Sequence, residues 1–169
     1  MTSRRERFER LYREHATDVA AYALRRTDRA TAEDVVAETF VVVWRRLHRV
    51  PAEPLPWLYA VARKVLANQR RGAARRSALG RRLESGTADA SYSPDVVVRD
   101  ALAALPESDR EILRLVAWEG LSPTDAAVVL GCSATAARLR LYRARNRLAD
   151  ALGLSRKREV PATVEEAPC

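Results

Sequence analysis

Apolar and polar residues alternate along the first part of the chain with the period of an α-helix. In residues 3–26, apolar side chains such as Phe8 and Tyr22 recur about every 3.6 positions, and arginine and glutamate fill the gaps. This pattern predicts helix throughout the stretch, as one helix or as two helices broken near Thr17. Residues 27–30 are polar and predict a turn.

The next stretch, residues 35–47, allows two interpretations. Its sequence VVAETFVVVWRRL is rich in β-branched and aromatic residues, which favour a strand. Thr31 and Asp34 precede it with the spacing of a capping box, and its large apolar residues form one coherent helical face, so we predict a helix. The residues of this inward face are Val36, Phe40, Val43, Trp44 and Leu47.

A second face of the same predicted helix is left outside. It combines charged residues with valine, and its members are Asp34, Glu38, Val41 and Arg45, with Val42 beside them. Exposed valines among charges are typical of a docking surface for another protein. The alternative is that these valines pack on a neighbouring helix of the same domain.

A proline-rich segment, residues 50–56, separates this helix from the next, because prolines remove backbone donors and fix φ. The helix that starts near Trp57 has an outer face of aromatic, amide and basic side chains. These are Tyr59, Arg63, Lys64, Asn68, Arg70 and Arg71. Such groups bind single-stranded nucleic acid by stacking, base-edge hydrogen bonds and phosphate contacts. The alternative is an ordinary solvated basic helix end.

Residues 75–94 lose the helical periodicity and turn small and polar, which predicts a linker. Two further helices follow it and supply apolar residues for a second core. Ser108 and Glu111 have the spacing of a capping box at the start of the second of these helices. We expect its apolar residues, Trp118 among them, to pack inward.

The stretch from 121 to 148 predicts a helix, a tight turn and another helix. Ser122 caps the first helix with Pro123 at its first position, and Gly131 ends it by accepting a left-handed backbone. Ser133 caps the following helix two residues later. The two helices must therefore cross sharply.

The last helix of this pair divides its faces unequally. Its inward stripe is narrow and consists of Ala137, Leu141, Ala144 and Leu148. Its outer face carries Thr135, Arg138, Leu139, Tyr142 and Arg143. A capped helix front followed by exposed guanidiniums favours a reader of the DNA major groove, because arginine bonds guanine bidentately and also holds phosphates. The alternative is a solvated basic face on an ordinary helical hairpin.

The composition gives the chain a positive net charge, which favours nucleic acid as a binding partner. The formal net charge is +8, and because only Lys64 and Lys157 are lysines, nearly all the positive charge is arginine. No apolar run approaches the roughly 18 residues of a membrane span, and the N-terminus lacks a signal-peptide core, so we expect a cytoplasmic protein. Isolated histidines and two distant cysteines, Cys132 and Cys169, predict no disulfide, no metal site and no cofactor.

Three stretches, in this order, resemble the extracytoplasmic-function sigma factors, the smallest bacterial sigma factors. They are TAEDVVAETFVVVWRRL (31–47), PLPWLYAVARKVLANQRR (54–71) and ALPESDREILRLVAWEGLSPTDAAVVLGCSATAARLRLYRARNRL (104–148). The resemblance covers most of the chain apart from the linker and the tail. It implies an all-α fold of two small helical domains joined by a flexible linker, with the helix-turn-helix in the C-terminal domain.

The resemblance also implies a division of tasks along the chain. Residues 1–74 would bind polymerase and the −10 promoter element, and residues 75–94 would link them to residues 95–153, which would bind the −35 element. Residues 154–169 would form a loose tail. The implied partners are core RNA polymerase, through its β′ clamp helices and β flap, promoter DNA and an anti-sigma factor. The family has no enzymatic activity of its own.

Each implied contact falls on one of the three outer faces described above. The β′ clamp helices would meet Asp34, Ala37, Glu38, Val41 and Arg45. The −10 element would meet Tyr59, Arg63, Lys64, Asn68, Arg70 and Arg71. The −35 element would meet Ser133, Thr135, Arg138, Leu139, Tyr142 and Arg143.

Two other functions explain only part of the sequence. A conventional DNA-binding regulator accounts for the helix-turn-helix but leaves the basic, aromatic face of the first half and the exposed valines unexplained. An enzyme acting on nucleic acid lacks support, because no paired carboxylates lie at metal-binding spacing beside a nucleophile. The sequence therefore favours a polymerase-dependent reader of promoters.

Overall fold

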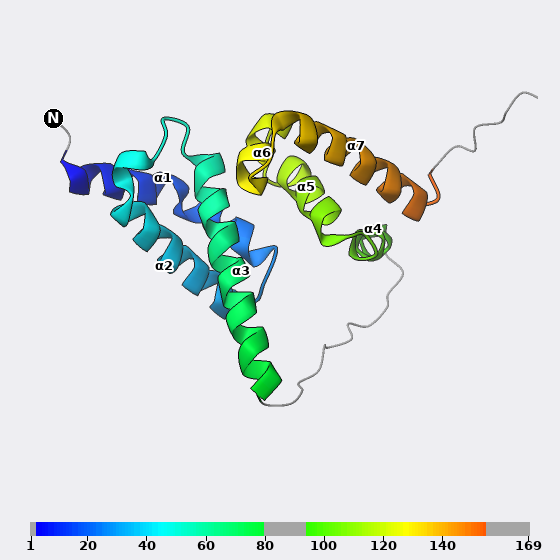
Figure 1. The fold of residues 1–169 in the computed structure, drawn as a ribbon, viewed down its shortest axis with the longest axis horizontal. Coiled ribbons are helices and arrows are strands. Elements are labelled where there is room, and N and C mark those ends of the chain that lie inside the picture. Colours follow the sequence, from blue (N-terminus) through cyan, green and yellow to red (C-terminus); the bar gives the residue numbers. More distant parts are fainter. Residues whose placement is uncertain (1–2, 80–93, 155–169) are drawn as a thin grey trace, which may run out of the picture.

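The computed structural model describes residues 3–79 and 94–154, and these residues form helices and no strand (Figure 1). The predicted all-α fold is confirmed. In chain order the elements are α1 (Arg4–Leu24), α2 (Arg29–Arg45), the short 3-10 helix η1 (Leu47–Arg49), α3 (Leu55–Leu79), α4 (Pro94–Ala103), α5 (Glu107–Ala117), α6 (Pro123–Leu130) and α7 (Ala134–Ala151).

The first three α-helices pack on one another and form what we call the first helical group (Figure 1). Residues 4–24 are one continuous helix, so the break considered near Thr17 does not occur. Side chains from all three helices meet in the core, and Tyr22, Val35 and Leu58 are fully buried there. Each large apolar side chain buried in this way contributes roughly 1.5–3 kcal/mol.

Residues 35–45 are helical, as predicted, but α2 begins earlier than its sequence suggested and ends at Arg45, and Leu47 begins the 3-10 helix η1. Its N-cap is Asp28, whose carboxylate accepts a hydrogen bond from the Thr31 backbone N–H at 3.0 Å, so Thr31 lies inside the helix. Trp44, expected in the core, is 40% exposed. The cause is its place at the rim of the group, where its ring lies 5.3 Å from that of Phe8 and beneath the guanidinium of Arg4.

Two expectations for α5 were wrong. Its N-cap is Pro106 and no side chain caps it, while Glu111 is buried and turns to partners in the first helical group instead of forming a capping box. Trp118, at the C-cap, is half exposed, with the guanidinium of Arg114 near its ring. Local spacing could not show either outcome, because both depend on where the helix lies against its neighbours.

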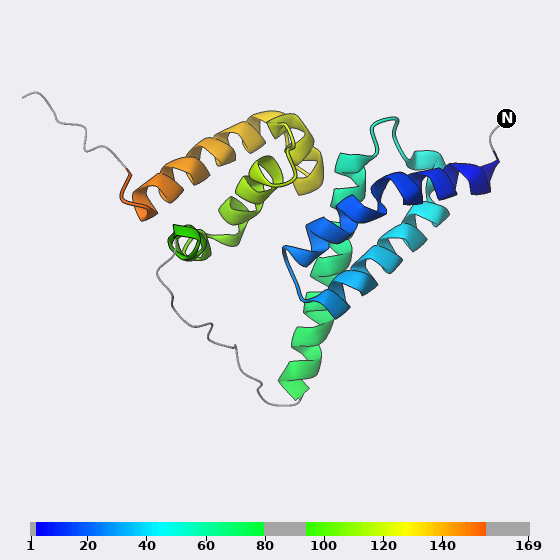
Figure 2. The same ribbon diagram turned by 180° about the vertical axis from the view of Figure 1, so that it is seen from behind.

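Helices α4 to α7 form the second helical group, in which α5 contacts both α6 and α7 (Figure 2). The predicted helix-turn-helix is confirmed in its details. Ser122 Oγ accepts from the Asp125 backbone N–H and Ser133 Oγ from the Ala136 backbone N–H, each at 3.1 Å. The inward stripe is also confirmed: Ala137, Leu141 and Ala144 are buried and Leu148 is half-buried.

The turn between α6 and α7 depends on a glycine. Gly131 has φ +68°, where other residues are strained, although a Cβ there would meet no atom within 4 Å. Gly131→Ala is therefore expected to lower the free energy of unfolding by about 1 kcal/mol. Gly72 lies inside α3 at ordinary φ, and a Cβ there would meet only the Arg76 side chain at 3.4 Å. Gly72→Ala should raise stability by about 0.5–1 kcal/mol, and urea titrations that give both variants the same sign would contradict this account.

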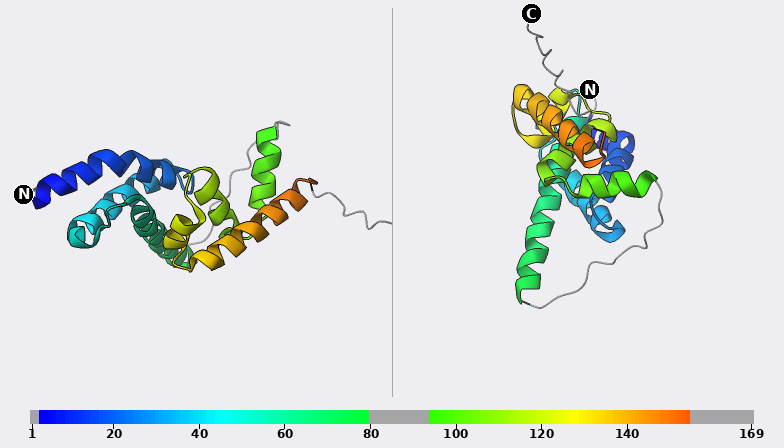
Figure 3. Two further views of the ribbon diagram at one scale, coloured as in Figure 1. Left: turned by 90° about the horizontal axis from the view of Figure 1, so that it is seen from above. Right: turned by 90° about the vertical axis from the view of Figure 1, so that its right-hand side faces the viewer.

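The two helical groups touch. α6 packs against α3, and views from the front and from above place the two helices side by side (Figures 1 and 3). α3 continues to Leu79, past residue 75, where the linker was expected to begin. The rest of that expected linker, from 80 to 93, and the expected tail beyond residue 154 lie outside the described residues.

Candidate nucleic-acid interface

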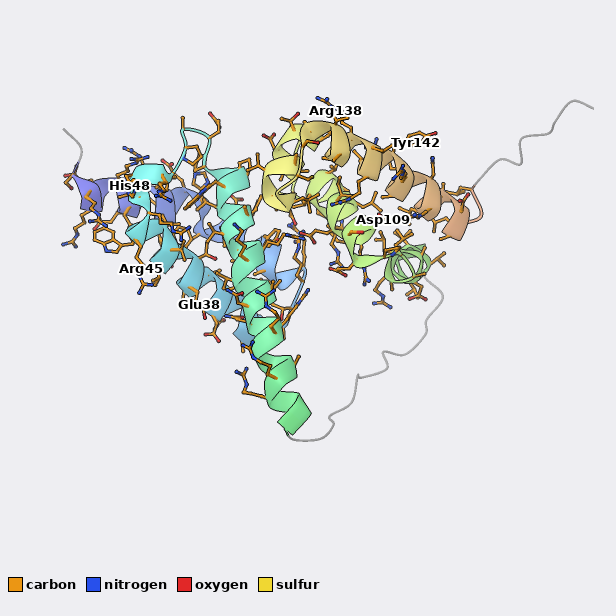
Figure 4. All side chains as sticks on the ribbon, in the orientation of Figure 1. Glu38, Arg45, His48, Asp109, Arg138 and Tyr142 are labelled. Atoms are coloured by element: carbon orange, nitrogen blue, oxygen red, sulfur yellow. The ribbon has the colours of Figure 1, made fainter. Side chains whose placement is uncertain are left out.

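The outer face of α7 is open to solvent along its length. All six residues implied for −35 recognition are exposed: Ser133, Thr135, Arg138, Leu139, Tyr142 and Arg143. Arg138 and Tyr142 extend away from the rest of the group (Figure 4). On another side of the helix, Arg147 pairs with the buried Asp109 and ties α7 to α5. The reading face is thus held by a packed core and left free to enter a groove.

The basic face of α3 matches the expectation except for Tyr59. The other five residues are exposed: Arg63, Lys64, Asn68, Arg70 and Arg71. Tyr59 is only 4% exposed, and its ring stacks on that of Tyr22 with centroids 5.0 Å apart. The reason is its spacing, because it precedes the buried residues Ala62 and Leu66 by three and seven positions and so shares their inner face. Burial raises the pKa of Tyr59 to about 12, so its phenol stays neutral.

Two of the arginines on α3 are positioned by short-range contacts. Arg70 donates to the backbone carbonyl of Arg26 at 2.7 Å, and Arg71 donates to the side-chain oxygen of Asn68. These contacts reduce the number of conformations that each guanidinium samples. The α3 face therefore presents a partly ordered row of positive charges.

The outer face of α2 is exposed as predicted. Its members Asp34, Ala37, Glu38, Val41 and Arg45 all face solvent, and Val41 is 48% exposed. Glu38 and Arg45 lie along one edge of α2 (Figure 4), and Glu38 accepts a hydrogen bond from the Gln69 side chain of α3 at 3.2 Å. The alternative in which Val41 packs inside the same domain is therefore wrong. An exposed valine between charged residues fits a protein-docking face.

A cluster of ionic side chains between the two groups was missed by the sequence reasoning. Arg26 of the first group donates to Glu111 at 3.0 Å and to Glu119 at 2.7 Å, and Tyr22 donates its hydroxyl proton to Glu111 at 3.0 Å. Arg25 also pairs with Glu119. No local signal could have revealed this, because each pair joins residues more than 80 positions apart.

Other kinds of site find no support in the part of the chain that the structure describes. There, no group of three or more histidine, cysteine, aspartate or glutamate residues could hold a metal ion. No described helix has the length and apolar character needed to cross a membrane. Cys132 is a free, half-buried thiol in the turn between α6 and α7, and Cys169 lies outside the described residues.

Comparison with known families matches both halves of the chain. The family model of sigma-70 region 2 matches residues 11–76, and that of sigma-70 region 4 matches residues 95–148. The ECF RNA polymerase sigma factor SigL of Mycobacterium tuberculosis is 35% identical over 143 residues, which cover 78% of this chain and 81% of the relative.

Two solved structures share the arrangement of helices. The sigma factor RpoE of Bartonella quintana, in complex with the anti-sigma factor NepR, has a TM-score of 0.66 and 27% identity, covering 88% of this chain and 98% of that one. CnrH, in complex with the cytosolic domain of CnrY, has a TM-score of 0.57 and 28% identity, covering 88% of this chain and 89% of that one. Both matches extend over helices of both groups, because neither group alone makes up 88% of the chain.

Proposed function

Since the chain belongs to the extracytoplasmic-function (ECF) sigma factors of RNA polymerase, we propose that it binds core polymerase, directs it to −10 and −35 promoter elements and takes part in opening the DNA. The observation that carries this proposal is the presence, on one chain, of three exposed faces with different chemistry. α2 offers charged and apolar groups, α3 offers basic groups, and α7 offers a helix-turn-helix reading face. A duplex-binding regulator needs only the last of these.

The proposed division of the chain follows the order of the two sigma regions. Residues 1–74 would act on polymerase and the −10 element, residues 95–153 would act on the −35 element, residues 75–94 would join them, and residues 154–169 would be a tail. On the polymerase side, the α2 face would dock on the β′ clamp helices, and the second helical group would meet the β flap. The exposed Val41 supports the first of these contacts, because burial of an apolar surface side chain by a partner is favourable.

The −10 contact would use the basic face of α3. Its arginines and Lys64 suit phosphates, and Asn68 can bond the edge of an unstacked base. Tyr59 could join this contact only after a rearrangement, because its ring is buried in the state described. The −35 contact would place α7 in the major groove, where Arg138 can bond a guanine and Leu139 can touch a thymine methyl group.

Regulation would come from a protein partner. Of the two structurally similar proteins, the sigma factor RpoE was solved with the anti-sigma factor NepR, and CnrH was solved with the cytosolic domain of CnrY. We therefore expect an anti-sigma factor to hold this chain inactive in the cytoplasm until a signal releases it. The chain itself would contribute binding and positioning, and the polymerase would supply the chemistry.

The test is a pull-down of the purified protein with bacterial core RNA polymerase, followed by run-off transcription on genomic fragments. Stoichiometric binding and new, discrete start sites are the expected result, and the start sites would give the promoter sequence. Binding to duplex DNA without any association with polymerase would instead establish a conventional regulator.

Arg138 offers a sharper test of the −35 contact. If its guanidinium reads a base, Arg138→Ala should cost about 1–3 kcal/mol in promoter binding and relax the preference at one base pair. Arg140→Ala is a matched control, because Arg140 is half-buried on a different side of the same helix. Transcription from a panel of −35 mutants measures the effect. An equal loss on every promoter would show that Arg138 holds a phosphate instead.

A further inference from the structure

The contact between the two helical groups has an unusual chemistry for a permanent interface. At its centre, the side chain of Arg26 is 2% exposed and that of Glu119 is 0% exposed. The Arg26 guanidinium lies 3.6 Å over the ring of Tyr22, and its Nη2 atom is buried without a hydrogen-bond partner. The interface therefore rests on buried charge at its centre, and one polar group there is left unsatisfied.

Such an interface is suited to opening. A buried ion pair gains little net stability, because both charges lose their water, and those charges regain hydration when the surfaces separate. The contrast is with the core of the first helical group, where Val19, Val35 and Val43 are fully buried. Separation of the two groups would let water solvate the buried charges, but it would also divide the buried apolar cluster, which is continuous across both groups.

The same contact faces the proposed −10 surface. A cleft of about 500 Å³ lies between the two groups. One wall carries Arg63, Arg70 and Arg71 of α3, and the other carries Glu107 and Glu111 of α5. Carboxylates thus face the guanidiniums that would otherwise bind DNA phosphates. The carboxylates of α5 therefore place negative charge opposite the first helical group, as the phosphates of promoter DNA would.

We call the arrangement in which the two helical groups touch the closed arrangement. In it, the two proposed DNA-reading faces are too close together to reach both promoter elements. The −10 and −35 elements are separated, by their names, by about 25 base pairs, or roughly 85 Å at about 3.4 Å per base pair. In the structure α3 touches α6 and α6 touches α7. Successive packed helices lie about 8–10 Å apart, so the two reading faces are only a few tens of ångströms apart. The two groups must therefore separate before both elements can be bound.

From these observations we infer that α5 of this chain is an internal competitor of promoter DNA: Glu111 and Glu119 clamp Arg25 and Arg26, hold the second helical group against the −10 face, and must release it before the promoter is read. This inference rests on the proposed function. It concerns the free protein, in the absence of polymerase, DNA and any protein partner. The α2 face stays exposed in this state, so polymerase can dock before the contact opens.

The double variant Glu111→Gln/Glu119→Gln tests the clamp. It keeps the shape of both side chains and removes both negative charges, and neither residue is among those proposed to bind DNA or the β′ clamp helices. Small-angle X-ray scattering of the free protein should show a larger radius of gyration than that of the wild type. Binding to a single-stranded −10 oligonucleotide, taken from the mapped promoter, should also tighten. If about a tenth of wild-type molecules are open, full opening raises the apparent affinity about tenfold.

Glu9→Gln/Glu14→Gln is the matched control, because it removes the same amount of charge from exposed positions on α1. It should leave the radius of gyration unchanged and alter DNA affinity far less. Far-UV circular dichroism checks that the variants stay helical. Should the double variant lose helix, Arg25→Gln removes only the outer ion pair, and it should expand the protein in the same direction by a smaller amount.

A double variant that stays as compact as the wild type would overturn the clamp, and so would an expanded variant that binds the oligonucleotide no better. The scattering measurement needs neither polymerase nor promoter. A failure of the proposed function would instead appear as an absence of polymerase binding by wild type and variants alike, so the two failures are distinguishable.

Discussion

Replacing Glu38 by arginine is expected to weaken binding to core RNA polymerase roughly a hundredfold, or about 3 kcal/mol. Glu38 is exposed on the α2 face, one helical turn after Asp34 and close to the exposed Val41. Electrostatic complementarity predicts a basic surface opposite these two carboxylates, and a reversed charge there places like charges together. Competition between the variant and labelled wild-type protein for core polymerase measures the change.

The matched control is Glu33→Arg, which makes the same change of charge on α2 at the edge of the docking face, one turn before Ala37 and about 140° around the helix from Glu38. Glu33 is exposed and pairs with Arg29 one turn earlier, so its replacement costs at most a few tenths of a kcal/mol of helix stability. It should bind polymerase nearly as well as the wild type. Both variants should keep the same affinity for −35 duplex DNA, because α7 lies in the other helical group. Unchanged polymerase affinity of Glu38→Arg would remove the α2 face from the proposal.

Truncation of Ile112 to alanine is expected to destabilise the second helical group by about 2–5 kcal/mol. Ile112 lies on α5, which packs on both helices of the helix-turn-helix, and its side chain is fully buried. Alanine would leave a cavity that the surrounding helices cannot fill completely. Because a helical group of this size is only marginally stable, a loss of this magnitude should unfold much of it. Binding to −35 DNA should therefore fall with it.

Val128→Ala serves as the control for Ile112→Ala. Val128 is in the same helical group but is 51% exposed, so its truncation should change stability by no more than about 0.5 kcal/mol. Thermal and urea unfolding, followed by circular dichroism, compares the two variants. Polymerase docking through α2 should persist in both. If Ile112→Ala unfolded with the wild-type midpoint, the second helical group would have to draw its stability from elsewhere.

The amino-acid sequence is enough to predict most of the helices of this protein and the faces that they present. Helical spacing of apolar residues correctly predicts helix for 35–45 despite the β-branched residues there, and it predicts the exposed Val41. The residues around Gly131 predicted the helix-turn-helix down to its two serine caps. These features are local: a cap, a turn or an amphipathic face depends on residues within a few positions, so the chain's order of residues encodes them directly.

Features that depend on distant partners become visible only when the helices are packed together. Ser108 and Glu111 have the spacing of a capping box. The Glu111 carboxylate instead accepts hydrogen bonds from Tyr22 and Arg26, which lie more than 80 positions away in the sequence. Helical spacing places Tyr59 on the same face as the buried Ala62 and Leu66, but only the fold supplies the ring of Tyr22 on which it stacks. The contact of α3 with α6 likewise could not be predicted from the sequence of either helix alone. Packing between helices depends on which surfaces meet in space. The local sequence around a charged or aromatic side chain therefore does not identify the residue that will cover it.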